Sequence, residues 1–195
     1  PSFQPRCNCL RRAAMLTFSP GPVPATLQAT LDRFDALLRA SGSATSMLIA
    51  WLAERDGTSK ATLLARVRAI VTPGISPAIL SRLGVENHSE VRYRRVWLTQ
   101  GGKVMSIAEN WYVGARLTGD MEAVLADSGT PFGAVIAPLA PMRETLHAER
   151  LWGGEEETAS VRLPGAVLRH DALVHAGDGT PLCVVSEVYT RNILL

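Results

Sequence analysis

Three charged residues, Arg94, Glu109 and Glu187, are the candidates for chemistry, because the strand pattern directs each toward an apolar face. A charge on such a face needs a partner or a ligand, since removing it from water is costly. An arginine can clamp a carboxylate, and a glutamate can donate a proton or share a hydrogen bond. A structural alternative stays open, in which Arg94 and Glu109 pair with each other and Glu187 faces solvent at a sheet edge.

Two expected helix starts could add groups that bind an anion. Capping side chains precede an apolar run near Ala44 and Thr45, so the first N–H groups there have no partner within the helix. Thr130, followed by proline, fits the N-cap of another helix that starts near Phe132 and Gly133. Uncommitted N–H groups at helix starts attract anions. The two starts would form one anion site if the fold brings them together.

A hairpin is expected to position Arg94 and Glu109. Residues 91–99 and 103–113 are strand-like, and the Gly-Gly pair between them is typical of a two-residue turn, because both glycines can take positive φ. A regular register across this turn places Arg94 opposite Glu109 on one face. That face is then apolar apart from a single ion pair.

The other elements follow from hydrophobic periodicity and turn signals. We expect helices at 23–41, from 43–46 through 52, at 77–83 and at 118–125, and strands at 63–71, 166–175 and 181–190, with loops at 84–90 and 141–160. The last two strands form a second hairpin, and Glu187 shares a face with apolar neighbours. The sequence therefore predicts an α+β fold: residues 1–23 as a flexible N-terminal arm, and 24–195 as a single domain with a mostly antiparallel sheet and helices packed on one face.

Composition excludes several function classes. The 195 residues carry a formal net charge of +2, and interleaved charges argue against a nucleic-acid partner. No apolar stretch approaches the about 20 residues of a membrane span. Three cysteines form no disulfide framework, which favours a cytoplasmic protein, and Cys7 and Cys9 are expected to be unpaired thiols. Phosphate-loop, dinucleotide, nucleophile-elbow and zinc motifs are absent and the four histidines are scattered, so we expect neither a metal nor a cofactor.

Several motifs along the chain resemble the chorismate lyase family, also called chorismate pyruvate-lyases. They are the run 93–98 with its Gly-turn hairpin, Thr-Pro-Phe-Gly at 130–133, and Gly-Thr-Pro-Leu at 179–182 with Ser-Glu at 186–187. The order of elements is similar from about Leu27 to Thr190. The resemblance implies an antiparallel sheet with helices against it, and conversion of chorismate to 4-hydroxybenzoate and pyruvate without a cofactor.

The resemblance also implies roles for individual residues. Arg94 falls on the arginine that binds the ring carboxylate, and Glu187 on the glutamate near the oxygen that leaves with pyruvate, which makes both the catalytic candidates. Glu109 stands where the ubiquinone-pathway branch has a second arginine, whereas an actinobacterial branch resembles the Ala108-Glu109 arrangement; Glu109 is a site residue without an assigned role. The carboxylate end is lined by Ala44, Thr45, Phe132 and Gly133.

Other functions remain open beside lyase activity. A relative of the lyases could act on a different aromatic or cyclic carboxylate, or be catalytically silent with a purely structural Arg94–Glu109 pair. The same fold resembles the effector-binding domain of GntR-type transcription regulators, which holds small ligands without turning them over. Those regulators carry an N-terminal helix-turn-helix, for which residues 1–23 are too short, so such a binder would be free-standing. In each case the expected partner is a small carboxylate, chorismate or an aromatic acid, and the oligomeric state is not predicted.

Overall fold

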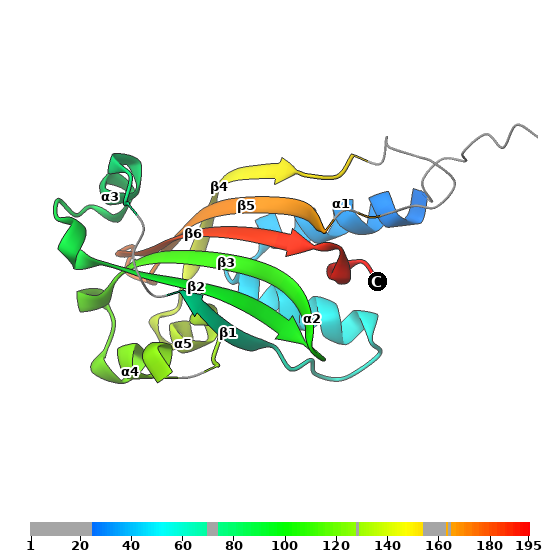
Figure 1. The fold of residues 1–195 in the computed structure, drawn as a ribbon, viewed down its shortest axis with the longest axis horizontal. Helices are drawn as coiled ribbons and strands as arrows, with labels where there is room; N and C mark the ends of the chain where they lie inside the picture. The colour runs from blue at the N-terminus through cyan, green and yellow to red at the C-terminus, as the bar shows by residue number, and fades with distance from the viewer. Residues whose placement is uncertain (1–24, 70–73, 128, 154–162, 164) are drawn as a thin grey trace, which may run out of the picture.

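Six strands form one sheet in the part of the chain that the computed structural model describes, which is residues 25–69, 74–127, 129–153, 163 and 165–195 (Figure 1). The strand order is β1-β2-β3-β6-β5-β4, and every neighbouring pair is antiparallel. The strands are β1 (Leu64–Ala69), β2 (Val91–Gln100), β3 (Lys103–Val113), β4 (Met142–Arg150), β5 (Ala166–His175) and β6 (Pro181–Thr190). The predicted arm, residues 1–23, lies outside the described residues.

Helices cover one face of this sheet, which we call the inner face. They are α1 (Ala25–Ala40), α2 (Ala44–Arg55), α4 (Gly119–Asp127) and α5 (Phe132–Val135), and their apolar residues join one core with the inward side chains of the strands. The predicted α+β class, with an antiparallel sheet and helices on one face, is confirmed. Short 3₁₀ turns connect the elements at His88–Glu90, Gly114–Arg116, Ala137–Leu139 and Arg191–Ile193.

The short helix α3 (Pro77–Leu83) packs against the opposite, outer face near one end of the sheet (Figure 1). Side chains alternate between the two faces of a strand. In β6, accordingly, Val184 joins the small cluster under α3, whereas Val185 joins the main core. Ser76 caps the start of α3 and Gly84, at φ 62°, ends it. The outer face therefore has a partial cover at one end.

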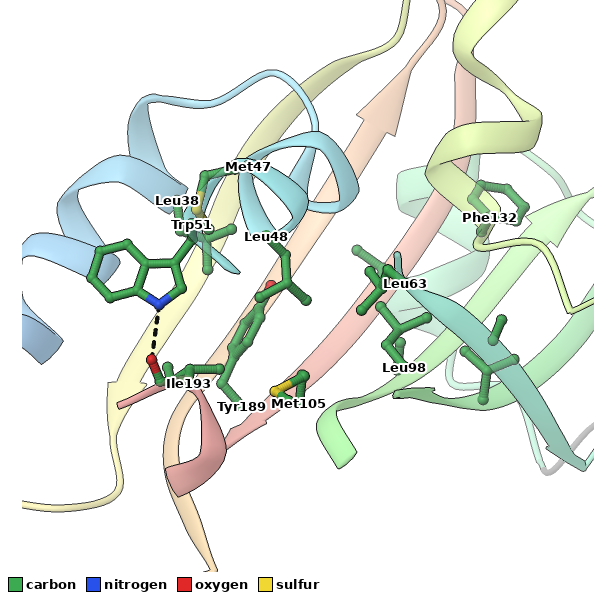
Figure 2. Close-up of a cluster of buried hydrophobic side chains, with 14 of the residues drawn as sticks. Leu38, Met47, Leu48, Trp51, Leu63, Leu98, Met105, Phe132, Tyr189 and Ile193 are labelled. Atoms are coloured by element: carbon green, nitrogen blue, oxygen red, sulfur yellow. Dashed lines mark hydrogen bonds between the residues drawn. The ribbon is translucent and has the colours of Figure 1, made fainter. Parts of the chain in front are cut away.

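The centre of the core lies where α1, α2 and β6 meet (Figure 2). Phe34 of α1 is fully buried and packs edge-on against Trp51 of α2 and Tyr189 of β6, with ring centroids 5.1 and 5.0 Å apart. The Trp51 indole N–H donates to the carbonyl oxygen of Ile193 at 2.8 Å, which ties α2 to the C-terminal turn. Leu31, Phe34 and Leu38 recur at helical spacing and form the buried face of α1. The helix predicted at 23–41 from this periodicity is thus present.

The register of β2 and β3 differs from the predicted one. The turn glycines have positive φ as expected, and Thr99 pairs with Val104. Leu98, however, pairs with Ser106, which leaves Met105 as an extra residue in a β-bulge. Met105 is 1% exposed and packs in the main core, so burial of its side chain accompanies the irregular pairing. Beyond the bulge every residue of β3 faces the side opposite to the one that a regular hairpin gives it.

The bulge separates Arg94 from Glu109, so their predicted pairing across the hairpin is wrong. Arg94 lies on the inner face, opposite Asn110, while Glu109 pairs in register with Arg95 and lies on the outer face. The Glu109 carboxylate accepts a hydrogen bond from the Tyr93 hydroxyl at 2.7 Å and lies 3.8 Å from the Arg95 guanidinium. Glu109 therefore cannot neutralise Arg94.

Candidate functional site

A cavity of about 50 Å³, the inner cavity, lies between the inner face of the sheet and the starts of α2 and α5. Water needs about 10–15 Å³ on this scale, so the inner cavity has room for a few water molecules or one small polar group, and it opens to solvent. Its walls are mostly apolar, with a few polar groups: Gly42, Ser43, Ala44, Thr45, Val96, Leu98, Ala108, Asn110, Phe132, Gly133, Ile136, Pro141, Arg143, Val174, Val185 and Glu187.

The first turn of α2 forms one end of the inner cavity. The Ser43 side chain accepts from the Ser46 N–H, and the Ser43 carbonyl oxygen accepts from the Met47 N–H. The N–H groups of Ala44 and Thr45 precede these bonds, and the helix itself offers them no acceptor. Because α2 is twelve residues long, its dipole adds partial positive charge at this end. The sequence-predicted anion site at Ala44 and Thr45 thus borders the cavity.

The start of α5 lies directly against that turn. A Cβ atom added at Gly133 would lie 2.5 Å from Thr45 Oγ1 and 3.0 Å from Thr45 Cβ, so only glycine allows the two helix starts to approach this closely. Phe132 lines the same cavity and packs against the ring of Tyr112 at 5.3 Å. The two helix starts are therefore brought together, as the anion site requires.

The N-cap of α5 differs from the prediction. Pro131, not Thr130, holds the N-cap position, and α5 is a single turn whose N–H groups from Ala134 and Val135 bond to the Pro131 carbonyl oxygen. Thr130 lies outside the helix, and its carbonyl oxygen accepts hydrogen bonds from the guanidinium of Arg94. A helix of one turn has little dipole, so α2 supplies most of the positive potential.

A buried ion pair also lines the inner cavity. Arg143 of β4 donates from Nη2 to Glu187 Oε2 of β6 at 3.0 Å, and from Nη1 to Thr145 Oγ1 at 2.9 Å. The Arg143 and Glu187 side chains are 2% and 8% exposed. Arg143 Nε is also buried, with no partner among the described residues. The cavity thus holds a guanidinium with an uncommitted donor and a carboxylate beside it.

Sequence reasoning missed Arg143, because residues 141–160 were expected to form a solvated loop. Residues Met142–Arg150 instead form the edge strand β4. The sequence of this segment is rich in charged residues, which is common in edge strands and also in loops. The sequence carries no alternating signal over 142–145, because the apolar Met142 is exposed while the polar Arg143 and Thr145 are partly buried. Residues 154–160 of the expected loop lie outside the described residues.

Arg94, the predicted carboxylate clamp, does not line the inner cavity. Its guanidinium is 1% exposed and donates from Nη1 and Nη2 to the carbonyl oxygen of Thr130, both at 3.2 Å. Burial lowers the pKa of Arg94. These bonds anchor the turn that leads into α5, so Arg94 positions one wall of the cavity from behind. Glu109, on the outer face, is also absent from the cavity.

Glu187 also adjoins a buried histidine. His170 of β5 pairs in register with Glu187 and is fully buried, and its Nε2 lies 2.6 Å from Asp35 Oδ1 of α1. Burial lowers the pKa of His170, and the hydrogen bond to Asp35 opposes that shift. His170 is thus a buried, hydrogen-bonded histidine. Among the described residues, no group of three or more His, Cys, Asp or Glu could hold a metal ion.

The lowered pKa of His170 predicts a pH-dependent stability. When pH falls below the ordinary histidine pKa of 6.5, the unfolded chain binds a proton that the folded chain rejects, so stability decreases by at most about 1.4 kcal/mol per pH unit. Urea unfolding at pH 7.5, 6.5 and 5.5 should show this loss in the wild type and a smaller loss in His170→Gln. His88→Gln, at an exposed histidine, should follow the wild type. Equal slopes in wild type and His170→Gln would contradict the assignment.

Comparison with solved structures identifies the fold. The effector domain of PhnF from Mycobacterium smegmatis gives a TM-score of 0.53 at 16% identity, covering 77% of this chain and 90% of that one. A structure of PhnF itself also gives 0.53, at 14% identity and 90% coverage of both chains. The ligand-binding domain of a putative GntR-family transcriptional regulator from Bordetella bronchiseptica gives 0.47 at 15% identity, covering 66% of this chain and 83% of that one. The two PhnF comparisons show that the chain shares the fold of the PhnF effector domain.

No protein-family model matches the chain. No helix among the described residues has the length and apolar character of a membrane span.

One curated protein is considerably more similar in sequence to this chain than the solved structures named above. The uncharacterized protein y4mC of Sinorhizobium fredii is 33% identical over 180 residues, which cover 85% of this chain and 76% of y4mC. The chain belongs to the same protein family as y4mC.

Proposed function

We propose that this protein binds a small carboxylate in the inner cavity and does not turn it over. One observation carries the proposal: the first-turn residues Ala44 and Thr45, whose N–H groups have no acceptor within α2, and the buried guanidinium of Arg143 line one cavity. Carboxylates are the preferred ligands of both kinds of group, since a helix start and an arginine each supply charge-assisted hydrogen bonds. The fold shared with an effector domain supports binding rather than catalysis.

The arrangement also indicates the shape of the ligand. A carboxylate in the inner cavity would share it with the polar groups of Asn110 and Glu187 and with the apolar side chains of Val96, Leu98 and Ala108. A cavity of about 50 Å³ encloses only the polar end of such a molecule. A compact aromatic or cyclic hydroxy acid meets these requirements, and 4-hydroxybenzoate is a suitable probe.

Gly133→Ala should weaken binding of 4-hydroxybenzoate about tenfold, the cost of about one charge-assisted hydrogen bond. The added methyl group would collide with Thr45 and displace the first turn of α2. Gly119→Ala is the matched control, because nothing lies within 4 Å of a Cβ at that position. Isothermal titration calorimetry on the three proteins checks the expectation. Equal affinities in the wild type and Gly133→Ala would place the carboxylate elsewhere.

Lyase activity is tested in the same samples. After incubation with chorismate, we expect 4-hydroxybenzoate and pyruvate to stay at the level of the spontaneous reaction. Stoichiometric formation of both products by the wild type, lost in Glu187→Gln, would overturn the non-catalytic proposal and make Glu187 a catalytic residue. The Glu187→Gln variant keeps a hydrogen-bonding group of the same size, so its folding is checked by thermal unfolding before the assay.

A further inference from the structure

A second cavity, the outer cavity, lies on the other side of the sheet. It measures about 300 Å³, at the lower end of the about 300–1,000 Å³ typical of ligand pockets. It lies between α3 and the outer faces of β3 to β6, and is lined by Ala78, Ile79, Arg82, Trp111, Leu146, His147, Arg169, Asp171, Val184, Val185 and Ser186. We propose that the outer cavity is a separate binding site for an aromatic molecule that carries one anionic group.

Bulges in two strands, β3 and β4, bring side chains to the outer cavity. The bulge at Met105 turns Trp111 to the outer face, where its ring packs against Tyr93 at 5.4 Å. A second bulge in β4, between Thr145 and His147, lets both Leu146 and His147 line the cavity. A regular strand would direct only one of two consecutive residues to this side. Both bulges therefore add lining side chains.

The walls of the outer cavity suit an aromatic ring. Trp111 provides an aromatic surface, and Ile79, Leu146 and Val184 provide aliphatic ones. Aromatic side chains favour offset or edge contacts with another ring, worth about 0.5–1.5 kcal/mol beyond area burial. The Trp111 indole N–H is buried and has no partner in the described part of the chain. Such an unsatisfied donor is uncommon in folded proteins.

The charge of the outer cavity specifies an anion. Its charged lining residues are two arginines, Arg82 and Arg169, and one aspartate, Asp171. Their formal charges sum to one net positive charge. Arg169 Nε pairs with Asp171 Oδ1 at 3.3 Å. Arg82 has no ion pair among the described residues, so its guanidinium is the one available to a ligand anion at the cavity rim. An aromatic monocarboxylate matches both the apolar walls and this charge.

The two cavities lie on opposite faces of the sheet, and strand β6 contributes residues to both. Ser186 lines the outer cavity, Glu187 lines the inner one, and Val185 borders both. Because different residues report on each side, binding to one cavity can be measured independently of the other. The outer-cavity proposal therefore does not rest on the carboxylate site of the inner cavity.

The test is a titration of the whole protein with 2-naphthoate, followed by ¹H–¹⁵N spectra of the indole groups. Trp111→Phe identifies the Trp111 signal among the four tryptophans. We expect 2-naphthoate to shift this signal saturably and the neutral 2-naphthamide to bind more weakly. Arg82→Ala should weaken binding about threefold to fivefold, the effect of losing one partly exposed charge pair. Arg66→Ala on β1 removes an exposed arginine far from the cavity and should leave the affinity for 2-naphthoate unchanged.

A filling variant makes the test decisive. Ala78 is an exposed lining residue of α3, so Ala78→Trp can occupy the outer cavity without altering the core. We expect it to abolish the 2-naphthoate shift of Trp111 while leaving the response of the Ala44 and Thr45 amides to 4-hydroxybenzoate unchanged. A Trp111 signal that does not respond to 2-naphthoate, or responds equally in Ala78→Trp, would overturn the outer site. Failure of the inner site would instead appear as unchanged backbone amide signals of Ala44 and Thr45 during titration with 4-hydroxybenzoate.

Discussion

Glu187→Ala is expected to lower the free energy of unfolding by about 3–5 kcal/mol, the cost of leaving a buried charge without its partner. Without the carboxylate, the Arg143 guanidinium, whose side chain is 2% exposed, keeps only the neutral acceptor Thr145 Oγ1 among the described residues. Urea unfolding at pH 7 measures the loss. This effect should be among the largest that a single substitution of a charged residue produces in this protein.

Two controls separate the buried charge from other causes. The double variant Arg143→Met with Glu187→Leu removes both charges and fills their space, so it should recover most of the lost stability. Glu54→Ala breaks the pair of Glu54 with Arg33, whose side chains are 58% and 56% exposed, and should cost at most about 1 kcal/mol. A loss below 1 kcal/mol in Glu187→Ala would contradict the assignment of Arg143 and Glu187 as a buried ion pair.

Phe34→Ala is expected to cost a similar amount, about 3–5 kcal/mol, through the loss of apolar contacts and the void left behind. Phe34 is fully buried between Trp51 and Tyr189, so the surrounding rings cannot close over the space without moving α1. Because α1 also carries Asp35, the partner of His170, a displaced α1 would weaken that hydrogen bond as well.

Leu37→Ala is the matched control for Phe34→Ala. Leu37 lies in the same helix but is 40% exposed, so its truncation should change the free energy of unfolding by about 0.5 kcal/mol or less. Thermal unfolding followed by calorimetry compares the two variants. Similar losses in both would mean that α1 is not held through Phe34.

Periodicity predicted most of the fold because burial and secondary structure agree along most of the chain. The two hairpins, helices α1 to α4 and the inward face of Glu187 follow from alternation, helical spacing and turn glycines. The bulge at Met105 could not be predicted, since inserting one residue changes no local pattern yet reverses the face of everything after it. The error on Glu109 follows from that one residue.

The candidate site was predicted where it depends on local signals. Capping and proline signals predict the two helix starts. The residues at these starts border the inner cavity: Ala44, Thr45, Phe132 and Gly133. Arg143 was missed because a charged edge strand reads like a loop, and its partner Glu187 is 44 residues away in the sequence. Arg94 was correctly directed to the inner face, but no sequence pattern shows that its guanidinium bonds to the Thr130 carbonyl oxygen.

The central claim, that a carboxylate binds at the start of α2, is tested most directly by following the backbone amide signals of Ala44 and Thr45. The protein is titrated with 4-hydroxybenzoate and, separately, with 4-hydroxybenzamide, which has the same shape without the charge. We expect saturable shifts of both signals with the acid and at least tenfold weaker binding of the amide, since the helix start and Arg143 each favour a charged acceptor. Equal responses to the two compounds, or none at Ala44 and Thr45, would contradict the proposed function.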